Sequence, residues 1–139
     1  MKFVHYKNIE GRQVCIMCEG YHYLYENTTL KDISYYFLPN YSVCLHPKVL
    51  FNMFILLRFQ ELFTKLLRNI RNGFKYLYEK HMEAILFTAK TPVALSMDES
   101  YVLFHKLSRM SLNTKFYCIQ NSYYGHYWAY KTTFKTMGI

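Results

Sequence analysis

A long helical repeat of apolar residues constrains this chain more than any other feature. Pro47 fits the first turn of a helix, because its missing N–H costs nothing there, and no Gly or Pro follows until Gly73. Apolar residues between them recur at three- and four-residue steps, the spacing of a buried helical face. They are Phe51, Ile55, Phe59, Leu62, Phe63, Leu66, Leu67 and Ile70. We therefore expect a helix here, a second from Phe74 to about Phe87 and a third that ends near Arg109.

The residues before Pro47 have the pattern of a small antiparallel sheet. Short runs rich in Val, Ile, Tyr and Phe are separated by turn-forming Gly, Pro and Asn residues. The pattern predicts strands at 3–6, 12–17, 21–25, 34–37 and 42–45, and later at 116–119 and 127–130. The predicted fold class is α+β. A small antiparallel β-sheet module (1–47) precedes a basic helical region that ends in a short C-terminal β-hairpin (48–139).

Positive charge begins where the first module ends. The chain holds 17 Lys and Arg against nine Asp and Glu, and residues 1–46 are neutral overall. The predicted helices carry a row of basic residues at Arg58, Lys65, Arg68, Arg71 and Lys75. With interleaved aromatic side chains, such a row can follow the phosphate backbone of DNA. The same pattern fits a solvated helix face or a helix at an anionic membrane surface, so three interpretations stay open.

Cysteine spacing indicates a candidate metal site. Cys15 and Cys18 are separated by two residues, which lets both thiolates reach one tetrahedral zinc ion. Cys44 and His46 project the same way from an extended strand and can supply a second pair. The predicted zinc ligands are thus Cys15, Cys18, Cys44 and His46. The alternative is that the first two cysteines are small buried hydrophobic residues of a strand.

Two absences set the expected compartment. The N-terminal residues lack the apolar stretch of a signal peptide, and the longest near-continuous apolar run, Val49 to Leu57, is too short to cross a bilayer, which needs about 20 residues. We expect a protein of the nucleus or cytoplasm that is not secreted and has no transmembrane segment. Its cysteines are then expected to be reduced rather than bridged.

The first module resembles a FLYWCH-type zinc finger. The matching residues are Phe3-Val4, Gly11, Gly20-Tyr21-His22-Tyr23, Tyr35-Tyr36-Phe37-Leu38 and Cys44. The resemblance covers residues 3 to 49 and implies a small zinc-holding β-sheet that binds DNA or protein. The chain departs from the family at Leu38, which stands where the first cysteine ligand belongs, and no His-x-His motif follows. The resemblance therefore implies either a rearranged zinc site or a degenerate finger.

The C-terminus resembles part of a Mutator-like transposase. Residues Trp128 to Thr136 are similar to a strand that reads Trp-x-x-Asp-Gly-Thr-Phe-Lys-Thr in that family. Its aspartate is the first carboxylate of the catalytic metal site, but this chain has Lys131 there. A lysine repels the cations that two-metal phosphoryl transfer requires, so we expect no catalytic activity. The alternative interpretation of these residues is an aromatic-rich terminal strand.

These observations together predict a non-catalytic module that binds nucleic acid or protein, similar to a FLYWCH-type finger. DNA or a protein is the expected partner, zinc is the expected cofactor, and no small-molecule substrate is evident. The alternatives are an interaction protein whose aromatic surface a partner covers, or an inactive transposon-derived remnant that lacks the catalytic aspartate.

Overall fold

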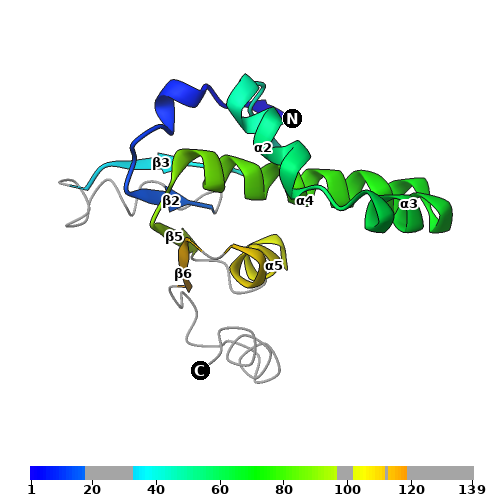
Figure 1. Cartoon of the computed structure of the whole chain (residues 1–139). Coiled ribbons are helices and arrows are strands. Elements are labelled where there is room, and N and C mark those ends of the chain that lie inside the picture. The colour runs from blue at the N-terminus through cyan, green and yellow to red at the C-terminus, as the bar shows by residue number, and fades with distance from the viewer. Residues whose placement is uncertain (18–32, 97–101, 112, 119–139) are drawn as a thin grey trace, which may run out of the picture.

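A four-stranded parallel sheet forms the centre of the fold (Figure 1). The computed structural model describes residues 1–17, 33–96, 102–111 and 113–118. The strands lie side by side in the order β3 (Tyr35–Phe37), β2 (Val14–Ile16), β5 (Val93–Ser96) and β6 (Lys115–Cys118). Every neighbouring pair is parallel, and Cys15 of β2 aligns with Tyr36 on one side and Ala94 on the other.

A second, smaller sheet lies near the N-terminus. It consists of β1 (Lys2–Phe3) and β4 (Ser42–Val43), which also run parallel. A short 3-10 helix, η1 (Tyr6–Asn8), follows β1. The predicted mixture of helices and strands is confirmed, but the predicted antiparallel pairing is wrong.

The chain lengths explain the parallel pairing. More than about a dozen residues separate β2 from β3, which is enough for the crossover that parallel neighbours need. Strand β5 was not predicted, because Pro92 reads as a turn signal in the sequence. The predicted strands at 21–25 and 127–130 lie outside the described residues. Strand β2 of the predicted first module and strand β5 of the predicted second part belong to one sheet.

The described residues contain four α-helices, which lie against the sheet or extend away from it. They are α2 (Pro47–Leu56), α3 (Phe59–Arg68), α4 (Ile70–Ala89) and α5 (Val102–Met110). Pro47 occupies the first turn of α2, as predicted. The single long helix expected after it is interrupted twice. Arg58 takes an extended conformation between α2 and α3, and its N–H donates to the Tyr76 hydroxyl at 3.2 Å. Asn69 caps α4 by accepting from Arg71 N–H at 2.9 Å.

The core lies between one face of the sheet and the helices α4 and α5. Cys15, Tyr36 and Ala94 of the sheet pack with Ile85 and Leu86 of α4 and Phe104 and Leu107 of α5. Val14 and Ile16 face the opposite side of the sheet and are also buried. Burial on both faces is typical of a central parallel strand.

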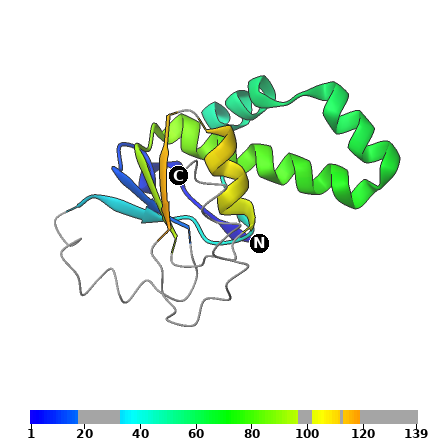
Figure 2. The same cartoon turned by 90° about the horizontal axis from the view of Figure 1, so that it is seen from below.

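Helix α3 and the first part of α4 lie away from this core. In Figure 2, α3 and the N-terminal half of α4 project from the sheet, whereas the C-terminal half of α4 lies against it. We call residues 47–78, which contain α2, α3 and the start of α4, the helical arm. The residues of α4 that follow the arm, from Glu79 to Leu86, are all buried. The arm therefore has surfaces that the sheet does not cover.

Candidate functional site

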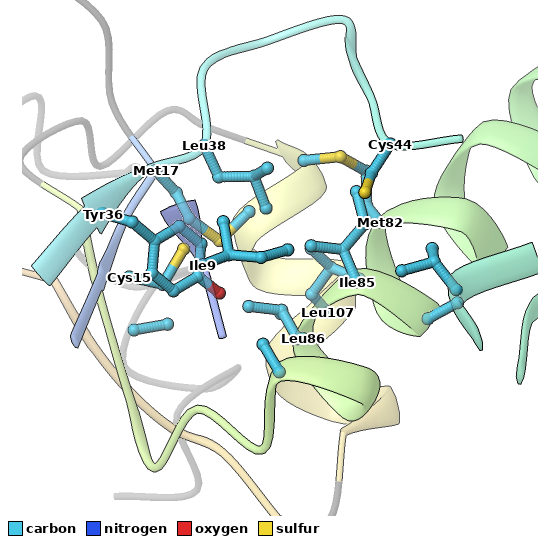
Figure 3. Close-up of a cluster of buried hydrophobic side chains, with 14 of the residues drawn as sticks. Ile9, Cys15, Met17, Tyr36, Leu38, Cys44, Met82, Ile85, Leu86 and Leu107 are labelled. Carbon is cyan, nitrogen blue, oxygen red and sulfur yellow. The ribbon is translucent and has the colours of Figure 1, made fainter. Parts of the chain in front are cut away.

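The three predicted zinc ligands that the structure describes, Cys15, Cys44 and His46, do not form one cluster. Cys15 is completely buried in the centre of β2, and Cys44 is 1% exposed. In Figure 3, Cys15 lies with Tyr36 at one end of the buried cluster and Cys44 lies at the other end. Cys18 lies outside the described residues. No group of three or more His, Cys, Asp or Glu side chains in the described part of the chain could hold a metal ion.

Cys44 and His46 have structural contacts of their own. The backbone N–H of Cys44 donates to Nε2 of His81 at 3.0 Å. Burial lowers the pKa of His81, which keeps the ring neutral and its Nε2 able to accept. His46 caps α2, because its Nδ1 accepts from Lys48 N–H at 3.3 Å, and its ring stacks on Tyr6. The described contacts of His46 therefore hold the start of α2, and zinc binding stays a prediction.

The five predicted nucleic-acid-binding residues all lie on the helical arm. Arg58, Arg68, Arg71 and Lys75 are exposed. Lys65 is half-buried, forms an ion pair with Glu61 at 3.1 Å and lies 4.6 Å from the ring centroid of Tyr76. The ion pair also lowers the pKa of Glu61, mainly through the hydrogen bond from Lys65. Lys65 therefore holds α3 against α4, and the other four cations face solvent.

The apolar side chains of α2 point in two directions. Val49 is buried, and Met53 and Leu56 pack against the core. Phe54 and Ile55, by contrast, are about two-thirds exposed. A helix that is apolar on both sides normally has an apolar neighbour on each of them. On the outer side of α2, Phe54 lies beside Phe59, and both rings stay more than half exposed.

The same arrangement continues along α3. Leu62 and Leu66 are half-buried, and Leu66 lies so close to Gly73 of α4 that a Cβ atom there would be 2.2 Å from its Cδ2. This edge of α3 is used for packing against α4. Phe63 and Leu67 lie on the neighbouring stripe, spaced four residues apart, and are 67% and 79% exposed. The prediction that this apolar repeat forms a buried face is therefore wrong for most of its members.

The exposed apolar residues of the helical arm are interspersed along the chain with its exposed cations. The stripes of α2 and α3 meet where the rings of Phe54 and Phe59 lie 6.0 Å apart. We name this set the apolar-basic surface, and its members are Phe51, Phe54, Ile55, Phe59, Phe63, Leu67, Ile70 and Phe74 with Arg58, Arg68, Arg71 and Lys75. The sequence indicates an exposed apolar side on α2, because residues 49–57 contain more apolar side chains than one helix face can bury.

A groove lies next to this surface. Its volume is about 900 Å³, and it runs between the loop before β2, α2 and the C-terminal end of α4. Apolar walls come from Phe51, Phe87 and Pro92. Three cationic residues line it, namely Arg12, Lys48 and Lys90, against one carboxylate, Glu10. No sequence pattern indicates that these residues lie together, because they come from three distant segments of the chain.

The strand order identifies a second candidate binding site, at the carboxyl ends of β2 and β5. The chain leaves β2 toward β3 on one side and leaves β5 toward β6 on the other, so the neighbours β2 and β5 form a topological switch point. Open parallel sheets bind ligands outside the carboxyl ends of their strands at such a point. Met17 and Ser96 lie at this edge and are buried. The segments that follow them, 18–32 and 97–101, lie outside the described residues.

No family model, curated protein or solved structure matches this chain. None of the described helices has both the length and the apolar content to span a bilayer.

Proposed function

We propose that this protein binds the surface of anionic membranes through the apolar-basic surface of its helical arm. The observation that carries the proposal is the exposure of eight large apolar side chains on α2, α3 and the start of α4, together with four exposed cations. Monomeric proteins seldom expose a contiguous apolar area larger than a few hundred Å² without a binding role. Interfacial helices combine Phe and Leu on one side with Lys and Arg beside them.

Charge distinguishes a membrane from a second copy of the chain. Residues 47–78 carry six basic side chains and one acidic side chain, Glu61, which is paired with Lys65. A symmetric dimer through this surface would place Arg68, Arg71 and Lys75 of one copy against a surface of the other that carries the same positive charge. An anionic bilayer, by contrast, attracts each of them by about 1 kcal/mol near its surface.

The apolar chemistry distinguishes a membrane from nucleic acid. Single-stranded nucleic acid binds proteins by stacking its bases on aromatic rings. Ile55, Leu67 and Ile70 have no ring, yet they are among the most exposed side chains of the arm. Acyl chains accept aliphatic and aromatic side chains alike, so the membrane interpretation uses the whole surface. DNA binding remains the competing prediction, supported by the exposed cations and the exposed Phe rings.

Vesicle cosedimentation tests the proposal. Full burial of a Phe or Leu side chain contributes about 1.5 to 3 kcal/mol, so replacing Phe59, Phe63 and Leu67 by serine should weaken binding to anionic vesicles at least a hundredfold. Val102→Ser is the matched control, because Val102 is 60% exposed on α5, outside the arm. It should bind like the wild type.

The charge contribution is tested separately. Arg68→Glu with Lys75→Glu should abolish binding to vesicles that contain about a third phosphatidylglycerol, whereas Arg109→Glu on α5 should change it little. Binding should also fall as salt shortens the Debye length from about 10 Å to about 3 Å. Equal binding of the wild type and the triple serine variant would refute the proposal. Tight binding to a single-stranded oligonucleotide without vesicle binding would favour the nucleic-acid interpretation instead.

The strand order supports a second candidate function, binding of a small ligand at the carboxyl edge between β2 and β5. We infer it from the switch point, because open parallel sheets bind ligands at that place. Adenosine and uridine diphosphates, NAD⁺ and inorganic phosphate are suitable probes in a thermal-shift assay. A ligand at about 100 times its Kd should stabilise the folded protein by about 2.7 kcal/mol. No shift with any of them at millimolar concentration would contradict this inference.

A further inference from the structure

We propose that the groove beside α2 binds a single anionic amphiphile, a molecule with a phosphate or carboxylate head and an apolar tail. This inference rests on the proposed membrane function, because the groove continues the apolar-basic surface. Phe51 belongs to both: it is 66% exposed on α2 and lines the groove. A lipid drawn from the bilayer into the groove would thus stay in contact with the same helix.

The size and walls of the groove fit an apolar tail. Its volume of about 900 Å³ lies within the usual range of ligand sites, about 300 to 1,000 Å³. Phe51 and Phe87 contribute exposed rings from two helices, and Pro92 adds aliphatic surface. Most of the wall is therefore apolar, which is suited to an acyl or alkyl chain.

Three polar side chains of the groove wall, Tyr6, Asn52 and Thr88, have hydrogen-bond partners within the protein. Asn52 Nδ2 donates to Thr88 Oγ1 at 2.8 Å, and the Tyr6 hydroxyl donates to the Thr88 carbonyl at 3.3 Å. The hydroxyl of Thr88 itself donates to the carbonyl of Ala84 at 2.6 Å. Because these bonds lie within the protein, an apolar tail can lie over the three side chains without breaking them.

Three cationic side chains in the groove wall can bind the anionic head group. Lys48 approaches the groove from the first turn of α2, Arg12 from the loop before β2 and Lys90 from the end of α4. Only Glu10 opposes them. The carbonyls at the C-terminal end of a helix would repel an anion, but here the carbonyls of Leu86 and Phe87 accept from Lys90 N–H. The net charge of the groove therefore favours an anionic group.

The test uses three soluble probes on the whole protein, measured by calorimetry. Short-chain phosphatidic acid below its micelle concentration carries both head and tail, inorganic phosphate carries only the head, and short-chain phosphatidylcholine carries a net neutral head. We expect phosphatidic acid to bind most tightly and the other two at least tenfold more weakly, because each lacks one of the two interactions. Equal affinities for phosphatidic acid and phosphatidylcholine would overturn the proposal.

Matched variants separate the groove from the surface. Lys48→Gln and Lys90→Asn should each weaken phosphatidic acid about tenfold; asparagine is chosen because Lys90 has φ 53°, which Asn tolerates. Lys75→Gln, on the apolar-basic surface, should leave this binding unchanged. Circular dichroism of each variant shows that it is folded. Unchanged affinity in folded Lys48→Gln and Lys90→Asn would overturn the proposal.

The two proposals fail in different ways. If the protein binds anionic vesicles but not soluble phosphatidic acid, the groove proposal is wrong and the membrane proposal stands. If it binds soluble phosphatidic acid through Lys48 but no vesicle, the groove is a site for an anionic amphiphile and the membrane proposal is wrong. Binding of inorganic phosphate as tight as that of phosphatidic acid would show an anion site without a tail, which also contradicts the groove proposal.

Discussion

Replacing Gly73 by alanine should destabilise the helical arm, although alanine favours helix. A Cβ atom at position 73 would lie 2.2 Å from Cδ2 and 2.6 Å from Cγ of Leu66, far inside van der Waals contact. Overpacking of this kind costs about 1 to 3 kcal/mol, whereas Gly to Ala in a helix gains about 1 kcal/mol. The expected net effect is a loss of about 1 kcal/mol in the free energy of unfolding.

A double-mutant cycle with Leu66→Ala tests whether the contact with Leu66 causes this loss. When Leu66 is shortened, the atoms that clash with the new Cβ are gone, so Gly73→Ala should stabilise by about 1 kcal/mol in that background. Urea denaturation of the four proteins measures the sign change. The reasoning is refuted if Gly73→Ala stabilises equally in both backgrounds, because α3 and α4 would then not approach closely at this glycine.

Three further predictions concern the core. Burial lowers the pKa of His81 in the folded protein. As the pH falls below about 6.5, the unfolded chain therefore binds more protons than the folded protein does. The free energy of unfolding should then fall by up to about 1.4 kcal/mol per pH unit. His81→Gln keeps an acceptor for Cys44 N–H and should reduce this dependence of stability on pH. Denaturation curves measured between about pH 7 and pH 5 test it, and an unchanged dependence would exclude His81 as its source. Tyr36→Phe should cost about 1 to 2 kcal/mol, because the buried hydroxyl of Thr91 loses its partner at 2.8 Å, and adding Thr91→Val should recover part of this loss. Cys15 and Cys44 are at most 1% exposed, so Ellman's reagent should modify both only on unfolding; rapid reaction of both in the folded protein, with release of zinc, would instead support a metal site.

Local signals in the sequence predict the elements of this fold better than their pairing. Pro47 starts a helix as expected, and four of the predicted strands before it correspond to β1, β2, β3 and β4. The interruption at Arg58 has no Gly or Pro to announce it, because it depends on the Tyr76 hydroxyl, 18 residues away. Parallel pairing is likewise a long-range property: the same alternation of residues suits either direction of a neighbouring strand.

The candidate site could be predicted only in part. The cations at Arg68 and Arg71 lie where helical periodicity places them, on the outside of the arm. The same periodicity predicts burial for Phe63 and Leu67, because an apolar repeat indicates a covered face but not what covers it. The groove could not be predicted, because Arg12 and Lys90 line it together only in the folded chain and lie far apart in the sequence.

The place of β2 in the sheet has a consequence for synthesis on the ribosome. Val14 pairs with Val93, a partner made roughly eight seconds later if translation proceeds at about ten residues per second. Until then one edge of the nascent strand Val14–Ile16 lacks its neighbour, and its apolar side chains are open to other chains in the cell. The growing polypeptide should therefore engage chaperones early and release them only after β5 has emerged.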